Sequence, residues 1–220
     1  ILKPSDVIHD LRFFIKNGLS PNPADISLPF IKPPRSLSSA LNLTFNALLQ
    51  VSKETNGTQV LEYFNIFFAP FLKGLDAATV KEALRLFIIS VSHHVDASIN
   101  LELTVPKFLA DKPAVGSASG CYGDFIDESQ LLATLVLEVF EEESLEKPLL
   151  NPKLIVKIRP ETFTDAKAAD ILIKAHHLSS QRGILYFANL LGEDEQFSVF
   201  SPSGSILNAD FKEDWEIDTV

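Results

Sequence analysis

The amino-acid sequence predicts an α/β domain, and three observations support this prediction. Residues 99–105 alternate apolar and polar side chains, as does a strand with one face in a core. Three segments before it, at 38–55, 58–72 and 76–91, carry apolar residues at helical spacing. After it, helical and strand patterns alternate, an order typical of α/β proteins with parallel strands. We therefore expect a helical part at about 36–92 and a strand and helix part at about 98–220.

The first half of the chain begins with a segment that fits two structures. Residues 6–17 have apolar residues at helical spacing with Asp6 as a possible N-cap, but their Ile, Val and Phe content also suits a buried strand. Prolines hold residues 19–35 in an extended linker. Of the three helices that follow, the one at 58–72 is unusually aromatic.

The second half is organised around the strand at 99–105. Pro106 ends this strand, because proline lacks the backbone donor that a sheet needs. A Gly/Ser run at 116–120 then leads to Cys121. The remaining elements that we expect are helices at 129–143 and 165–179, the second capped by Thr162 or Thr164, strands at 154–158 and 184–189, a hairpin within 196–209, and an acidic tail.

The composition is that of a globular protein with an acidic surface. Of 220 residues, 46% are hydrophobic, and 29 acidic residues outweigh 19 basic ones, which gives a net charge of −10. Without a basic stripe, no nucleic-acid partner is expected. No apolar run reaches the roughly 18 residues of a spanning helix, and the first residues are not a secretory signal. We expect no membrane association and a cytoplasmic location.

Two residue counts set further limits. The single cysteine, Cys121, excludes an internal disulfide and any four-cysteine zinc site within this chain. The sequence contains no methionine, even at position 1, which indicates either an internal piece of a longer chain or a sequence that has lost residues.

Two groups of polar residues in apolar surroundings are the candidates for a binding site. His9 and Asp10 lie inside a strongly apolar stretch, and Asn100 and Glu102 occupy the polar side of the central strand. Burial of such groups is costly unless they are hydrogen-bonded, so they indicate a polar cavity or a helix junction. From the residues alone, we predict an α/β domain with a polar pocket beside the central strand.

Other candidate sites have weaker support. The adjacent histidines at 93–94 and 176–177 point to different sides of a regular element, whereas metal ligands from one helix need i, i+4 spacing, so no metal site is predicted. Cys121 is either a small buried residue or a nucleophile that needs a histidine nearby. The run at 116–120 matches neither phosphate-binding glycine pattern, and its central residue, Ala118, excludes a nucleophile elbow.

Several segments resemble, in order, the anaerobic (class III) ribonucleoside-triphosphate reductases, which are glycyl-radical enzymes. The segments are 8–14 (IHDLRFF), 64–71 (FN through APF), 98–106 (SINLELTVP), 122–125 (YGDF), 186–189 (YFAN) and 208–216 (NAD through DWE). Together they cover almost the whole chain, which makes the resemblance fairly specific.

The resemblance implies that residues 1–220 are part of a ten-stranded α/β barrel with a helical N-terminal portion. It implies an oxidoreductase that reduces ribonucleoside triphosphates to deoxyribonucleotides by radical chemistry. In the full-length family we expect zinc, and a glycyl radical made by a radical-SAM (S-adenosylmethionine-dependent) activating protein. It also implies a homodimer. The aromatic segment 58–72 is a candidate contact, although packing in the core explains its aromatic residues equally well.

On the matched segments, the resemblance implies that Ser98 and Asn100 face the nucleotide with Glu102 beside them. His9 and Asp10 would be a polar framework. The radical glycine, the zinc-binding cysteines and the N-terminal ATP cone have no counterpart in this sequence, and Cys121 lies at neither family cysteine position. No catalytic residue is therefore assigned.

Three hypotheses remain for the function. The chain is a piece of a reductase catalytic subunit that is inactive alone, or it is a relative without radical residues that binds nucleotides or a partner without turnover. The third hypothesis, an unrelated cysteine hydrolase, requires a histidine within about 3 Å of Cys121.

Overall fold

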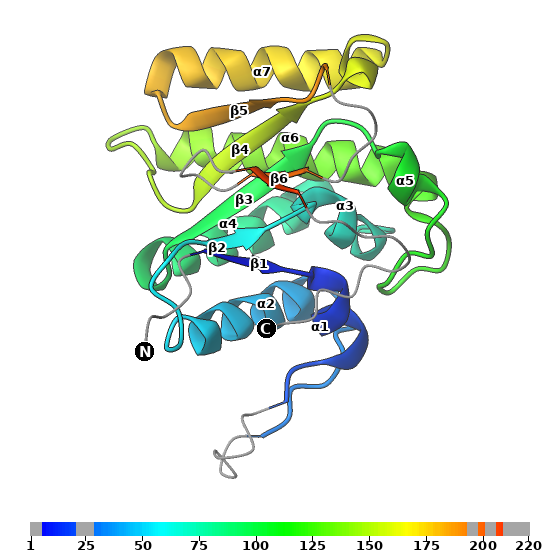
Figure 1. The fold of residues 1–220 in the computed structure, drawn as a ribbon, viewed down its shortest axis with the longest axis vertical. Coiled ribbons are helices and arrows are strands. Elements are labelled where there is room, and N and C mark those ends of the chain that lie inside the picture. Colours follow the sequence, from blue (N-terminus) through cyan, green and yellow to red (C-terminus); the bar gives the residue numbers. More distant parts are fainter. Residues whose placement is uncertain (1–5, 21–28, 193–197, 201–205, 209–220) are drawn as a thin grey trace.

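A parallel five-stranded sheet organises the chain in the computed structural model, which describes residues 6–20, 29–192, 198–200 and 206–208 (Figure 1). The strands follow one another across the sheet in chain order, and each neighbouring pair is parallel. The predicted α/β class with parallel strands is confirmed. The strands are β1 (Val7–His9), β2 (Gln59–Leu61), β3 (Ala97–Glu102), β4 (Lys153–Ile158) and β5 (Leu185–Asn189).

Four long helices of the described chain cover one face of the sheet, each connecting two neighbouring strands. They are α2 (Leu37–Val51), α4 (Ala77–His94), α6 (Ile126–Glu143) and α7 (Ala166–Arg182). They pack side by side in this order (Figure 1). Apolar side chains such as Ile99 and Leu101 of β3 and Leu154 and Val156 of β4 pack with them into one core. Parallel neighbours need crossover connections of this kind.

Shorter elements lie at the carboxyl ends of the strands. α1 (Leu11–Asn17) follows β1, α3 (Phe64–Phe68) and the 3-10 turn Ala69–Phe71 follow β2, and α5 (Lys107–Ala110) and the 3-10 turn Tyr122–Phe125 follow β3. The 3-10 turn Pro160–Phe163 follows β4. In Figure 1, α1, α3 and α5 lie at the same end of the sheet. The segments after the first four strands therefore gather where ligands bind in many parallel sheets.

Side-chain caps explain where several helices begin. Asp10, Asp76 and Asp165 accept backbone N–H bonds of 2.9 Å at the starts of α1, α4 and α7. The expected caps of α7, Thr162 and Thr164, are wrong, because both residues lie in or directly after the preceding 3-10 turn. Asp6 is not a cap either: it accepts the backbone N–H of Thr58 at 3.1 Å.

The segment 6–17 contains both of its predicted structures, because β1 is followed directly by α1. The predicted helix at 58–72 is wrong in its first half, which is β2 between β1 and β3. Tyr63 then takes a left-handed conformation with φ 50°, so no helix crosses it. The part at about 36–92 is therefore not wholly helical.

The aromatic residues that suggested a contact surface at 58–72 are core residues. Tyr63, Phe64, Phe67 and Phe68 are all 0% exposed. A short segment buried on all sides has no periodicity that distinguishes a strand from a helix, so the sequence does not show where β2 ends. This segment presents no aromatic face to a partner.

The other predicted elements are present with small shifts of their ends. The strand expected at 99–105 is β3, which ends at Glu102, and the helix expected at 38–55 is α2, which ends at Val51. The hairpin is represented by β6 (Ser198–Phe200) and β7 (Ile206–Asn208), which pair antiparallel. Its turn, most of the linker and the acidic tail lie outside the described residues. None of the described helices has the length and apolar content needed to cross a bilayer.

Candidate functional site

The face of the sheet away from the long helices carries polar side chains on β3, and on β4 it carries two lysines with the apolar Ile155 between them. Ser98, Asn100 and Glu102 share this face of β3, while Ile99 and Leu101 pack in the helix-covered core. Ser98 and Asn100 are 0% exposed and Glu102 is 1% exposed. The two-sided pattern predicted for the central strand is confirmed, although both of its faces are buried.

Four charged side chains form an alternating chain of ion pairs on this face. Lys157, the register neighbour of Glu102 on β4, contacts the carboxylate of Glu62 and lies 3.4 Å from that of Glu102. Arg159 then donates from Nε and Nη2 to Glu102, at 2.8 and 2.9 Å. Two carboxylates and two cations together carry no net charge. This balance permits their burial, since an uncompensated buried charge costs several kcal/mol.

The chain topology explains why these charges meet. Glu62 follows β2, Glu102 is the last residue of β3, and Lys157 and Arg159 lie near the end of β4. Parallel strands that are neighbours in the sheet bring their carboxyl ends to one edge. The Tyr63 ring lies over the Lys157 ammonium, 4.3 Å from Nζ to the ring centroid, which adds a cation–π contact.

Burial and charge shift the pKa values of this cluster. Burial raises the pKa of the Glu62 carboxyl, and the Lys157 charge opposes this shift. Burial, together with the charges of Glu62 and Glu102, raises the pKa of the Tyr63 hydroxyl well above its ordinary value. For Arg159, burial lowers the pKa, but the charge and hydrogen bonds of Glu102 outweigh it and the net shift is upward. Tyr63 is thus held neutral and Arg159 charged.

Two buried polar atoms in the middle of this face have no hydrogen-bond partner among the described residues. Asn100 donates from Nδ2 to Glu62 at 2.6 Å and to the Phe200 carbonyl of β6 at 3.0 Å, but its Oδ1 has no donor. The Ser98 Oγ is also unpartnered. Buried polar atoms are nearly always satisfied, so these two positions can receive polar groups of a ligand. In Figure 1, β6 lies in front of β3 and β4, on this polar face.

The structure places His9 on the other side of the sheet from Ser98, Asn100 and Glu102. His9 is in register with Leu61, which packs in the helix-covered core. Its Nε2 bonds with Gln59 Oε1 at 2.9 Å, and Gln59 Nε2 donates to the Leu48 carbonyl of α2 at 2.9 Å. Because a carbonyl only accepts, the Gln59 amide orientation is fixed and His9 is the donor.

Asp10 is also apart from that group. Its carboxylate caps α1 and accepts from Arg12 Nε at 3.0 Å and Nη2 at 2.9 Å. His9 and Asp10 are therefore held in local polar networks, and of the predicted site residues only those of β3 lie together. Beside β3 lie the charge chain and the ring of Phe200 of β6, whose centroid is 5.9 Å from Lys157 Nζ. A cavity does occur elsewhere, between α2 and α4.

Sequence reasoning missed Glu62, Lys157 and Arg159. The signal was present, since Lys157 interrupts the apolar run LIVKI and Glu62 lies within VLEYF. A charge at the position of a buried strand indicates a buried partner, the argument that had been applied to His9 and Asp10. The partner itself was not visible, because Glu62 and Lys157 are 95 residues apart.

The remaining candidate chemistry has no support in the described residues. No three His, Cys, Asp or Glu side chains there come together to hold a metal ion, so they do not fit a zinc site. Cys121 is half-buried at the start of the turn Tyr122–Phe125, and its backbone N–H donates to Asp124 at 2.8 Å. Among the described residues, histidines bond to groups other than Cys121, such as Gln59 and the Ser90 carbonyl, which gives the cysteine hydrolase no support.

Known structures share this fold. The anaerobic ribonucleotide reductase from Thermotoga maritima in complex with dATP and CTP matches with a TM-score of 0.70 at 12% identity, over 87% of this chain and 34% of that chain. The same enzyme with dATP in the specificity site matches with a TM-score of 0.69 at 12% identity, over 86% and 34%. These matches define the class: an α/β protein with the fold of part of an anaerobic ribonucleotide reductase.

The family follows from the sequence. The model for "Anaerobic ribonucleoside-triphosphate reductase" matches residues 3–213. The chain belongs to this family, as its motifs predicted, and it spans about a third of the length of the solved chains. A comparison with curated proteins finds no match.

The buried His9 predicts an acid-sensitive fold. Burial lowers its pKa from 6.5 to about 4, although the bond to Gln59 opposes the shift. As the pH falls, His9 therefore takes up a proton in the unfolded chain before it does so in the folded chain. The contribution of neutral His9 to the free energy of unfolding is complete above pH 6.5 and is lost as the pH falls to about 4. Urea unfolding from pH 7.5 to 4 should show that the wild type loses about 3 kcal/mol more than His9→Gln.

The matched control for this prediction is His176→Gln, at an exposed histidine of α7. It should keep the pH profile of the wild type. Parallel profiles for the wild type and His9→Gln would contradict a neutral, buried His9.

Proposed function

We propose that this chain forms the substrate-side wall of the catalytic subunit of an anaerobic ribonucleoside-triphosphate reductase, with Ser98, Asn100 and Glu102 toward the nucleotide. The observation that carries the proposal is the buried polar face of β3, where Ser98 Oγ and Asn100 Oδ1 have no partner among the described residues. Hydroxyl groups of a ribose could satisfy both atoms.

The electrostatics of the site favour the uncharged part of a nucleotide. Glu62, Lys157, Glu102 and Arg159 neutralise one another, so the cluster has no net attraction for a triphosphate. Ser98 and Asn100 therefore suit the sugar, and the phosphates need a different contact. The alternative, a relative that binds nucleotides without turnover, is not favoured by the family match.

The rest of the reductase is proposed on the family alone. A sheet covered by helices on one side only is compatible with the wall of a ten-stranded barrel whose interior is the polar face. The radical glycine, the S-adenosylmethionine-dependent activating protein and zinc belong to the proposal for the whole protein, which we place in the cytoplasm.

Ser98→Ala separates ligand binding from stability. The Ser98 hydroxyl is buried without a described partner, so its removal should leave the melting temperature unchanged or higher. It should weaken the binding of a ribonucleoside triphosphate about fivefold to tenfold, the value of one hydrogen bond. Calorimetric titration of the chain with CTP, ATP, GTP and UTP measures this loss.

Ser180→Ala, at an exposed serine of α7, is the matched control and should bind as the wild type does. Two results would contradict the proposal: no binding of any of the four nucleotides by the wild type, or equal affinity in Ser98→Ala.

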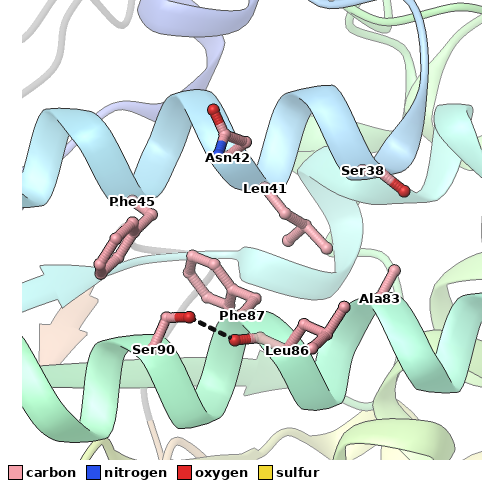
Figure 2. A pocket seen from close by; sticks show the side chains of 8 residues that line it. All are labelled: Ser38, Leu41, Asn42, Phe45, Ala83, Leu86, Phe87 and Ser90. Carbon is pink, nitrogen blue, oxygen red and sulfur yellow. Dashed lines mark hydrogen bonds between the residues drawn. The ribbon is translucent and has the colours of Figure 1, made fainter.

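We also propose that the expected homodimer forms through a groove between α2 and α4 rather than through the segment 58–72. Figure 2 shows this groove, a cavity of about 190 Å³ with apolar walls from Leu41, Phe45, Leu86 and Phe87. Leu86 is 62% exposed there. An exposed apolar groove of this kind is a common feature of protein contact surfaces.

Charge favours a second copy of the chain as the occupant. The 15 residues of α2 include none with a charge, and no charged residue lines the groove. Two copies that each carry a net charge of −10 repel one another. They approach with least repulsion across an uncharged strip, and a two-fold contact brings the same strip from both copies.

Leu86→Glu should therefore shift the chain to a monomer, because it places a like charge in both halves of the contact. The matched control is Ile173→Glu, at a residue of α7 that is 66% exposed, and it should leave the dimer intact. Sedimentation velocity measures both. A wild type that stays monomeric at about 100 µM, or equal effects of the two variants, would overturn the proposed contact.

A further inference from the structure

We propose that Asn65 is a positioning residue that sets the backbone of Glu102 and, through it, the Glu102–Arg159 end of the charge chain. Any role of Asn65 in ligand binding rests on the nucleotide site proposed above. The effect of Asn65 on Glu102 and Arg159 does not rest on that nucleotide site.

The side chain of Asn65 takes the place of a missing strand. The pairing of β2 with β3 ends at Leu61 and Ile99, whereas β3 continues to Glu102. Beyond this point the Asn65 amide bonds to both backbone groups of Glu102: Oδ1 accepts from its N–H at 3.0 Å, and Nδ2 donates to its carbonyl at 2.7 Å. A side-chain amide that satisfies both groups of one residue replaces the bonds of a neighbouring strand.

The Asn65 amide is itself held in one orientation. Its Nδ2 also donates to Ser129 of α6, with Oγ at 2.8 Å and the carbonyl at 3.2 Å. Asn65 is 0% exposed, so no water competes for these bonds. One side chain from α3 thus joins the end of β3 to α6.

The turn before α3 brings Asn65 to this position. Tyr63 has φ 50° and ψ 35°, a left-handed conformation that a tyrosine rarely adopts. It lies between Glu62, which contacts Lys157, and Asn65, which contacts Glu102. Unfavourable backbone conformations persist where the surrounding structure requires them. Here the turn lets a short segment reach the charge chain at both of its carboxylates.

Asn65 is placed to act on Arg159 through Glu102. The Glu102 carboxylate holds Arg159 with two hydrogen bonds of 2.8 and 2.9 Å, which need its backbone to stay in register. Asn65→Leu keeps the branched shape of the side chain and removes the amide bonds. Ser129→Ala removes one anchor in α6 but keeps both bonds from Asn65 to Glu102, so it is the matched control.

The readout is the NMR signal of the Arg159 Nε–H proton, which Glu102 protects from exchange with water. A purely structural contribution of Asn65 to folding would leave this signal unchanged in the folded state. We expect at least tenfold faster exchange in Asn65→Leu and less than twofold change in Ser129→Ala. If Asn65→Leu does not fold, Asn65→Ala, which also removes both bonds to Glu102 but adds neither bulk nor charge, should show the same increase. Unchanged exchange in a folded Asn65 variant would overturn the inference.

Titration of the same variants with CTP separates this inference from the proposed function. Asn65→Leu should bind CTP fivefold or more weakly than Ser129→Ala does at a temperature where both are folded. If Arg159 exchange responds as expected but the wild type binds no CTP, the positioning role stands and the nucleotide site fails. If CTP binds with equal affinity to both variants, the role of Asn65 in ligand binding is refuted.

Discussion

The contact of Lys157 with two glutamates is the interaction on which the polar face of this protein depends. Its ammonium lies between Glu62 and Glu102, and Arg159 neutralises the remaining charge. These side chains come from three neighbouring parallel strands or the residues directly after them, so the pairing also holds the strand ends together. Loss of any one charge leaves the others unbalanced in a region closed to water. Removal of one charge alone is therefore costly, whereas removal of an oppositely charged pair keeps the balance.

The two faces of the sheet differ, and the arrangement of the helices follows from this difference. Apolar side chains of the strands need cover, and the four crossover helices supply it on one side only. The other side carries the charge chain and the polar side chains of β3, with Val60 and Ile155 beside them. Asn65 and the carbonyl of Phe200 bond to β3 there, while Ser98 Oγ and Asn100 Oδ1 have no partner among the described residues. In the function that we propose, these two atoms contact the ribose of the nucleotide.

Local sequence patterns predicted the amphipathic elements. They did not predict contacts between residues that are far apart in the sequence. The alternation in β3 and the apolar stripes of α2 and α4 could be predicted because the two faces of each element differ in polarity. The segment 58–72 was not, since its residues are buried all round and a turn at Tyr63 divides strand from helix. Ser98, Asn100 and Glu102 were found on the polar side of β3. Glu62, Lys157 and Asn65 were not, because their partners lie 95 and 37 residues away.

A double-mutant cycle between Glu62 and Lys157 tests the central claim most directly, with unfolding free energies measured in urea. Glu62→Gln and Lys157→Met each leave one net charge buried, and each should cost about 3–5 kcal/mol. The double variant restores neutrality, because Glu102 and Arg159 still compensate one another. We predict that it is about 2–3 kcal/mol more stable than the sum of the single effects indicates. Additive effects would contradict a charge chain that depends on its balance.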